Sequence, residues 1–127
     1  MSLFDLTGHV AIITGGNGGI GLGMALGLAK AGASLAIVGR NSDKNKIAIE
    51  KLQRMGATAI AIEKDITEEL AGTDVVTEVE DRFGRVDILI NNAGSNIRKR
   101  PEELSLDDFR WVQDTNLTSA FVFSQAV

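Results

Sequence analysis

Short apolar runs alternate with helix-length segments along the first 90 residues, and this alternation restricts the fold more than any other feature of the chain. Each run has only four or five residues, which suits strands that helices cover on both faces. Alternation of strands and helices implies parallel pairing with right-handed crossovers. We therefore predict an α/β fold with helices on both faces of a parallel sheet, in the spatial order 3-2-1-4. The predicted strands span 10–13, 35–38, 58–62 and 86–90, and the predicted helices span 20–31, 42–55 and 67–83, with Ser42 as the N-cap of the second helix.

A last helix is predicted from Ser105 onwards, where "SLDD" has the form of a capping box. Its middle carries four poor helix formers within 115–119, which predicts a local kink or an inserted water near Asn116. After Leu117 the helix is apolar on nearly every side, so we expect it to be buried on more than one side. No stop signal follows. We therefore expect residues 1–127 to be the N-terminal part of a single domain, truncated after the fourth βα unit.

The composition argues against several classes of site. The chain has no cysteine and a single histidine, so neither a disulfide nor a thiolate or histidine metal cluster can form, and no metal is expected. A formal net charge of −4 without a basic face argues against a nucleic-acid partner. No apolar run approaches the roughly 20 residues of a membrane span, and the start of the chain does not have the pattern of a signal peptide. We expect a soluble, cytoplasmic protein with no membrane partner.

A glycine-rich segment, "TGGNGGIG" at 14–21, joins the first predicted strand to the first predicted helix. Glycine tolerates positive φ and lets a ligand approach the backbone closely. The start of a helix offers unpaired N–H groups and a partial positive charge, and both attract phosphate. The spacing is Gly15-x-x-x-Gly19-x-Gly21 rather than G-x-G-x-x-G. Its position between a buried strand and a helix favours a phosphate-binding loop over a flexible turn without a ligand.

Four segments of the chain resemble, in the same order, motifs of the short-chain dehydrogenase/reductase family. They are "TGGNGGIG" at 14–21, "KDIT" at 64–67, "NNAG" at 91–94 and "TNLTSAF" at 115–121. The resemblance spans nearly the whole chain and implies a Rossmann-like domain that binds NADP or NAD. It also implies a homo-oligomer, a tetramer or a dimer, built partly on the last helix.

The resemblance also implies roles for individual residues. Asp65 would accept a hydrogen bond from the adenine amino group, and Ile66 would cover the ring. Asn116 would interrupt the last helix so that its freed backbone carbonyl holds a water in a proton relay, which makes it the one catalytic residue present. The alternatives are a solvated turn aspartate and a solvent-facing helix asparagine. The implied cofactor-binding residues are Gly15, Asn17, Gly18, Gly19, Ile20, Gly21, Arg40, Asn41, Asp65, Ile66, Asn91, Asn92, Ala93 and Gly94.

The end of the second strand is expected to select the cofactor. An acid there takes the ribose hydroxyls of NAD, whereas an arginine suits the 2′-phosphate of NADP. The sequence has Gly39 in the usual place of the acid, followed by Arg40, which favours NADP. Two observations weaken this preference: Gly18 lacks the basic side chain often found in the loop of NADP-using relatives, and an Arg40 that only stacks on adenine would serve either cofactor.

Three cations follow the "NNAG" segment in "SNIRKRP" at 95–101. The arrangement resembles family members that act on sugar acids such as gluconate and its keto forms, and an arginine suits a substrate carboxylate. Ser95 and Arg98 are therefore the candidate substrate-binding residues. The alternative is a solvated charge run balanced by Glu102 and Glu103.

Family chemistry also requires a serine and a Tyr-x-x-x-Lys pair, but the chain contains no tyrosine. We expect these residues to lie beyond residue 127. The complete protein is then expected to be an NAD(P)-dependent oxidoreductase that transfers a hydride between nicotinamide and the hydroxyl or carbonyl group of a small-molecule substrate, a sugar acid or polyol. Reduction of a carrier-linked 3-oxoacyl group is the rival activity, and a non-catalytic dinucleotide-binding module is the rival class.

Overall fold

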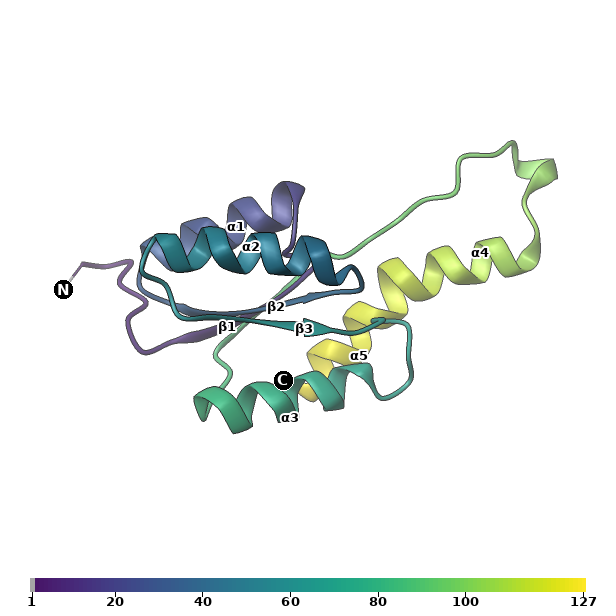
Figure 1. Ribbon diagram of the computed structural model, residues 1–127. Coiled ribbons are helices and arrows are strands. Elements are labelled where there is room, and N and C mark those ends of the chain that lie inside the picture. The colour runs from purple at the N-terminus through teal and green to yellow at the C-terminus, as the bar shows by residue number, and fades with distance from the viewer. Residues whose placement is uncertain (1) are drawn as a thin grey trace.

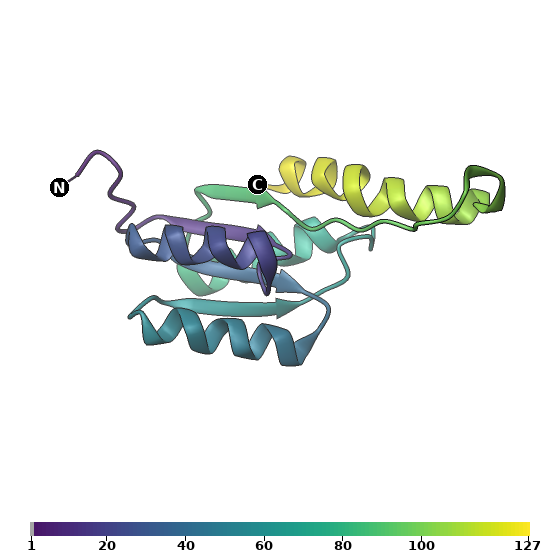
Figure 2. The same cartoon turned by 90° about the horizontal axis from the view of Figure 1, so that it is seen from above.

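The computed structural model describes residues 2–127, which form a four-stranded parallel sheet between two layers of helices (Figure 1). The order β3-β2-β1-β4 confirms the predicted arrangement. The register pairs Thr14 with Val38 on one side and with Asn91 on the other. The strands therefore end at the same edge of the sheet (Figure 2). They are β1 (Val10–Thr14), β2 (Ser34–Gly39), β3 (Ala59–Glu63) and β4 (Ile88–Asn91).

Each face of the sheet has its own apolar core, because successive strand residues point to opposite faces. Ile13 and Ile37 pack beneath α1 and α2, whereas Ile12 and Val38 pack against α3 and α5 (Figure 1). All four side chains are fully buried. Burial on both faces explains why β1 and β2 are apolar without alternation. The covering helices are α1 (Gly19–Lys30), α2 (Ser42–Arg54), α3 (Ala71–Phe83) and α5 (Ser119–Ala126).

The segment after β4 first leaves the sheet as an irregular chain and then returns as a long interrupted helix (Figure 1). This helix consists of α4, a π-helical turn η2 and α5, so the predicted irregularity near Asn116 is confirmed as a π-turn. The predicted capping box is also present: the Ser105 hydroxyl accepts from the Asp108 N–H at 2.9 Å. The further elements are η1 (Pro101–Glu103), α4 (Leu106–Gln113) and η2 (Asp114–Thr118).

One predicted helix start and one predicted N-cap were wrong. The third helix begins at Ala71 rather than Thr67, because the backbone N–H and the hydroxyl of Thr67 both bind the Asp65 carboxylate and hold a turn there. The N-cap of α2 is Asn41 rather than Ser42, because the Asn41 side chain accepts from the Lys44 N–H at 3.0 Å. Asparagine at this position satisfies one of the four N–H groups that a helix start leaves free.

Within residues 2–127 the last helix is buried on one side only. Phe123 is fully buried in the core beneath α3, whereas the side chains of Leu117 and Phe121 are 66% and 65% exposed. The prediction that this helix is buried on more than one side is therefore not met by residues 2–127. None of the helices in this part of the chain has the length and apolar character needed to cross a membrane.

Candidate cofactor site

A cleft of about 480 Å³ lies where the strands end. Its walls come from the glycine loop, the ends of β2, β3 and β4, and the helix turn at Trp111 and Thr115. This is the place where an open parallel sheet binds its ligand, because the helices after β1 and after β3 leave toward opposite faces. The predicted site residues that line it are Gly15, Asn17, Arg40, Asn41, Asp65, Ile66, Asn92, Ala93, Gly94 and Ser95.

The glycine loop is packed tightly against the segment after β4. Gly15 has a φ of +66°, and a β-carbon there would lie 3.0 Å from the Ala93 Cα. A β-carbon on Gly21 would overlap the Gly15 carbonyl oxygen and the Asn92 Nδ2 atom. Both glycines are therefore needed for close packing inside the protein, and Gly21 is buried behind the loop rather than on the wall of the cleft.

The start of α1 is open and uncapped. Gly18 occupies the N-cap position and offers no side-chain hydrogen bond. Gly19 has a φ of +54°, and a β-carbon at either glycine would meet no atom within 4 Å. Within residues 2–127 the N–H groups of Gly19, Ile20 and Gly21 have no acceptor outside the helix. Free N–H groups at a helix start fit a phosphate or pyrophosphate, so the residues present suit a dinucleotide.

Thr14 joins the glycine loop to the segment after β4, although the sequence did not mark it as a site residue. Its buried hydroxyl accepts from the Asn92 N–H at 3.1 Å and from the Ala93 N–H at 3.0 Å. The Asn92 side chain in turn donates to the Gly15 carbonyl oxygen at 3.2 Å. A polar residue that ends an otherwise apolar strand was the only available signal of this role.

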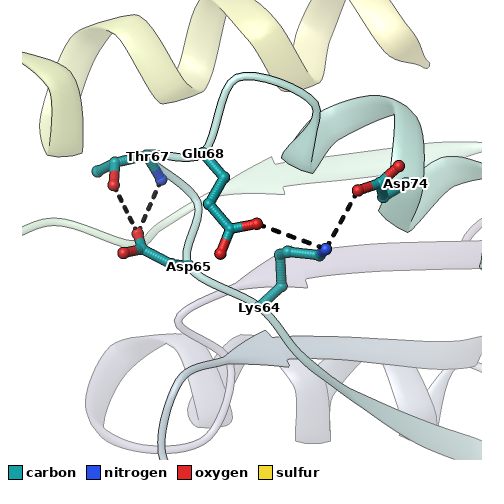
Figure 3. Close-up of polar contacts among 5 residues, drawn as sticks. All are labelled: Lys64, Asp65, Thr67, Glu68 and Asp74. Carbon is teal, nitrogen blue, oxygen red and sulfur yellow. Dashed lines mark hydrogen bonds and ion pairs between the residues drawn. The ribbon is translucent and has the colours of Figure 1, made fainter.

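Asp65 lies in the turn after β3, two residues beyond the end of the strand. Its Oδ1 atom accepts from the Thr67 hydroxyl at 2.7 Å and from the Thr67 N–H at 2.9 Å (Figure 3). The Thr67 hydroxyl, and then its N–H, hold the pKa of the Asp65 carboxyl below its usual value, with a smaller contribution from the nearby Arg40 charge. The carboxylate is therefore ionised at neutral pH, with both of these bonds on one oxygen.

The turn that carries Asp65 is held to α3 by Lys64. The Lys64 ammonium lies 3.2 Å from the Asp74 carboxylate and 3.6 Å from that of Glu68 (Figure 3). The hydrogen bond to Asp74 is the main reason that the pKa of Lys64 is raised. This ion pair spans the turn from its first residue to the first turns of α3, and it fixes the path of the chain at the rim of the cleft.

The Asn116 side chain holds the backbone of Ser95, at the wall of the cleft, by hydrogen bonds. Its Oδ1 accepts from the Ser95 N–H at 3.0 Å, and its Nδ2 donates to the Ser95 carbonyl at 2.7 Å and to the Val112 carbonyl at 2.8 Å. A β-carbon on Gly94 would lie 2.5 Å from the Asn116 Oδ1, so glycine permits this contact. The structure thus gives the Asn116 side chain a local bonding role in the π-turn, while Ser95 remains on the wall of the cleft.

Several predicted residues do not lie on the wall of the cleft. Asn91 donates to the Ser124 hydroxyl at 3.1 Å, and Arg98 lies on the irregular chain that leaves the sheet. Ile20 is 79% exposed at the start of α1. The others outside the wall are Gly18, Gly19, Gly21 and Asn116.

The structure also adds residues that the sequence analysis missed. Lys44, Lys64, Thr67, Trp111 and Thr115 line the cleft. The cation of Lys44 is unusual, because it lies in the first turn of α2, where the helix dipole favours acids. That mismatch was a sequence signal for Lys44, and Lys64, Thr67 and Thr115 lie in the segments 64–67 and 115–121 that resemble family motifs.

A glycine loop that leads into an uncapped helix, and that lines a cleft at the carboxyl edge of a parallel sheet, defines a Rossmann-like α/β domain. The family model for short chain dehydrogenase matches residues 9–127 of the sequence. The chain therefore belongs to the short-chain dehydrogenase family, as the four sequence segments implied.

The curated relatives that the chain matches are sugar-acid dehydrogenases and a reductase of aromatic compounds. The chain is 37% identical over its whole length to 2-dehydro-3-deoxy-D-gluconate 5-dehydrogenase of Formosa agariphila, covering 48% of that protein. It is 39% identical to gluconate 5-dehydrogenase of Gluconobacter oxydans, over 98% of the chain and 49% of the relative. It is 41% identical to a hydroxynaphthalene reductase of Aspergillus fumigatus, over 87% of the chain and 41% of the relative. The chain thus spans about half the length of the curated relatives it matches.

Solved structures agree with this membership. L-sorbose reductase from Gluconobacter frateurii, complexed with NADPH and L-sorbose, superposes with a TM-score of 0.92 at 30% identity, over 98% of this chain and 48% of that one. NAD⁺-bound xylitol dehydrogenase superposes with a TM-score of 0.90 at 35% identity, over 96% and 47% of the two chains. One of these relatives was solved with NADPH and the other with NAD⁺.

Proposed function

We propose that residues 1–127 are the cofactor-binding, N-terminal part of a single-domain NAD(P)-dependent oxidoreductase. The observation that carries this proposal is the glycine loop, because its Gly15 and Asn17 line the cleft at the ends of the strands and it leads directly into the uncapped start of α1. Relatives with the same architecture carry NADPH or NAD⁺. When bound, the nicotinamide supplies or accepts the hydride of the reaction.

The residues around the cleft would divide the binding of the dinucleotide among them. The N–H groups at Gly19 to Gly21 would hold the pyrophosphate. The Asp65 oxygen that Thr67 leaves free would accept from the adenine amino group, and Ile66 would pack on the ring. Asn92 and Ala93 would lie beneath the ribose on the nicotinamide side, because Thr14 holds their backbone there.

We further propose that NADP is preferred over NAD. Position 39 at the end of β2 carries no acid, and Arg40 and Lys44 line the cleft beside it. Among residues 2–127 neither cation takes part in an ion pair, so both charges are available to a phosphate. Two unpaired cations beside a helix start favour the dinucleotide that carries the additional phosphate.

We propose a sugar acid or polyol as the substrate, and a homo-oligomer as the assembly. Ser95 lies on the wall of the cleft. Of the three cations that follow it, Lys99 is paired with Asp108 at 3.2 Å, and Arg98 and Arg100 would supply partners for a carboxylate. The names of the gluconate-related relatives support this class, whereas the hydroxynaphthalene reductase among the relatives is named for a substrate that is not a sugar acid. Reduction of a carrier-linked 3-oxoacyl group remains the rival activity. The exposed Leu117 and Phe121 suit burial against a second copy. A cytoplasmic location and a catalytic role for Asn116 remain predictions from the sequence.

The test uses the complete protein. Binding of NADPH and NADH is measured by the change in nicotinamide fluorescence, for the wild type and for Gly19→Val, which places a branched side chain in front of the helix start at a φ that valine disfavours. We expect affinity to fall at least tenfold, which is about 1.4 kcal/mol. Unchanged affinity in a folded variant would contradict the proposal. Turnover on keto-gluconates, polyols and acetoacetyl thioesters then separates the substrate classes.

A further inference from the structure

A buried amide joins the glycine loop to the end of β2. Asn45 lies in α2 with only 3% of its surface exposed. Its Nδ2 donates to the Gly39 carbonyl at 2.9 Å, and its Oδ1 accepts from the Asn17 Nδ2 at 2.9 Å. One side chain thus connects three elements that border the cleft, although Asn45 itself is not on the wall.

The same amides occupy the space in which a side chain on residue 39 would begin. A β-carbon built on Gly39 would lie 2.7 Å from the Asn45 Oδ1 and would overlap the Asn17 Nδ2. Both atoms are at the ends of side chains, so they could move aside. Moving them would break the two hydrogen bonds of a buried amide, and an unsatisfied buried polar group is costly. Residue 39 is therefore kept a glycine by its neighbours and not by its own backbone, whose φ is not in the left-handed region.

Position 39 is also where a dinucleotide-binding sheet places the acid that takes the ribose hydroxyls of NAD. We propose that Asn45 is a specificity-determining residue for the cofactor. Together with the Asn17 amide that it binds, it excludes a side chain from residue 39 and so keeps a carboxylate away from the adenosine ribose. Arg40 and Lys44 are then the charged groups beside the ribose. This inference rests on the proposed function, because it concerns the choice between two dinucleotides.

The inference predicts that an acid at residue 39 works only when residue 45 is shortened. Gly39→Asp alone must displace Asn45, so it disturbs the loop and binds both dinucleotides poorly. Asn45→Ala alone leaves residue 39 a glycine, so it weakens both affinities without changing their ratio. In the double variant the Asn17 amide is released from Asn45 and can move into the space that the shorter residue leaves, which makes room for the carboxylate. This variant is expected to bind NAD at least tenfold more tightly than Gly39→Asp does, a coupling of about 1.4 kcal/mol between the two sites.

The experiment measures dissociation constants for NADH and NADPH in the complete protein, for the wild type, both single variants and the double variant. A control combines Gly39→Asp with Gln53→Ala, which shortens an exposed side chain of the same helix. Thermal melting reports whether each variant folds. We expect the double variant alone to shift the preference toward NAD, and rescue of an unfolded Gly39→Asp by Asn45→Ala would support the same conclusion.

The inference is overturned by a Gly39→Asp variant that shifts the preference as far as the double variant does, by rescue by the Gln53→Ala control, or by failure of the double variant to fold. A wild-type protein that binds neither dinucleotide overturns the proposed function, and the inference with it. Wild-type binding with a preference that the double variant does not move overturns the inference alone.

Discussion

Two glycines in the first turns of α1 provide a matched test of the cofactor site. Gly21 is buried, and a β-carbon there would overlap the Gly15 carbonyl oxygen and the Asn92 amide nitrogen. Gly23 is exposed in the same helix, and a β-carbon there would meet no atom within 4 Å. Replacing either residue by alanine adds one methyl group to the same helix, so the two variants differ mainly in what that methyl group meets.

The expected difference between the variants follows from this geometry. Alanine stabilises a helix interior by up to about 1 kcal/mol relative to glycine, and this gain is similar at both positions. Gly21→Ala also forces the glycine loop away from Asn92, and overpacking of this kind costs about 1–3 kcal/mol. The free energy of unfolding of the Gly23→Ala variant should therefore be about 1–3 kcal/mol larger than that of the Gly21→Ala variant. For a domain of 150–250 residues this corresponds to a melting temperature that is about 2–12 °C higher.

Cofactor affinity provides the second measurement. Gly21→Ala displaces the loop that presents the helix start, so we expect the dissociation constant for NADPH to rise at least tenfold. Gly23→Ala should leave it unchanged. Melting curves with and without NADPH, together with fluorescence titrations of the complete protein, measure both quantities. Equal melting temperatures, or equal affinities, for the two variants would show that the contact between the loop and Asn92 does not support the site.

Further predictions concern the rim of the cleft and the chain as a unit. Arg40→Asp should lower the affinity for NADPH and raise the affinity for NADH in titrations. If the ratio of the two affinities does not change, Arg40 only stacks on the adenine ring. Thr14→Val leaves the Ala93 N–H without its acceptor and the Asn92 N–H with only the Ile90 carbonyl, and it should lower the free energy of unfolding by about 1–3 kcal/mol in urea titrations. The pKa of Asp65 is lower in the folded protein than in the unfolded chain. The carboxylate therefore stabilises the fold fully at a pH above its unfolded-state pKa, and this stabilisation is lost as the pH falls through its folded-state pKa. The melting difference between wild type and Asp65→Asn should therefore shrink below about pH 4. Residues 1–127 alone should self-associate in sedimentation experiments, because Leu117 and Phe121 are exposed. They should show no turnover, because the Tyr-x-x-x-Lys pair that would provide acid–base catalysis, worth about 10²–10⁴ in rate, is absent.

The order of the strands and the place of the glycine loop could be predicted from the sequence, because both follow from local patterns. Apolar runs of strand length, separated by helical segments, leave few parallel topologies. The glycine spacing at a strand–helix junction has a direct physical reason. The poor helix formers near Asn116 likewise predicted a local irregularity of the helix, which the structure shows as a π-turn, since their effect is local.

The contacts that position the site could not be predicted, because they join residues far apart in the sequence. Thr14 reaches a segment almost 80 residues away, and nothing near Thr14 indicates that partner. Asn45 looks like an ordinary polar residue of an amphipathic helix until the glycine loop is placed beside it. The capping of α2 by Asn41 rather than Ser42 was a choice between adjacent residues that both cap helices well, so composition could not decide it.

The register of the sheet also sets the order in which the domain can fold during synthesis. Ala11 pairs with Leu35 after 24 residues but with Ile88 only after 77 residues. β1, β2 and β3 can therefore associate while β4 is still being made. Between Glu63 and Asn91 the ribosome adds 28 residues, which takes about 1–6 s at about 5–20 residues per second.

During that interval one edge of β1 has no partner, and an open strand edge is a place where a nascent chain pairs with the wrong strand. The wall of the cleft formed by Asn92, Ala93 and Gly94 cannot exist until this interval ends. A dinucleotide can thus stabilise the domain only after β4 has paired with β1. We expect the cofactor to slow unfolding of the finished domain without speeding its assembly.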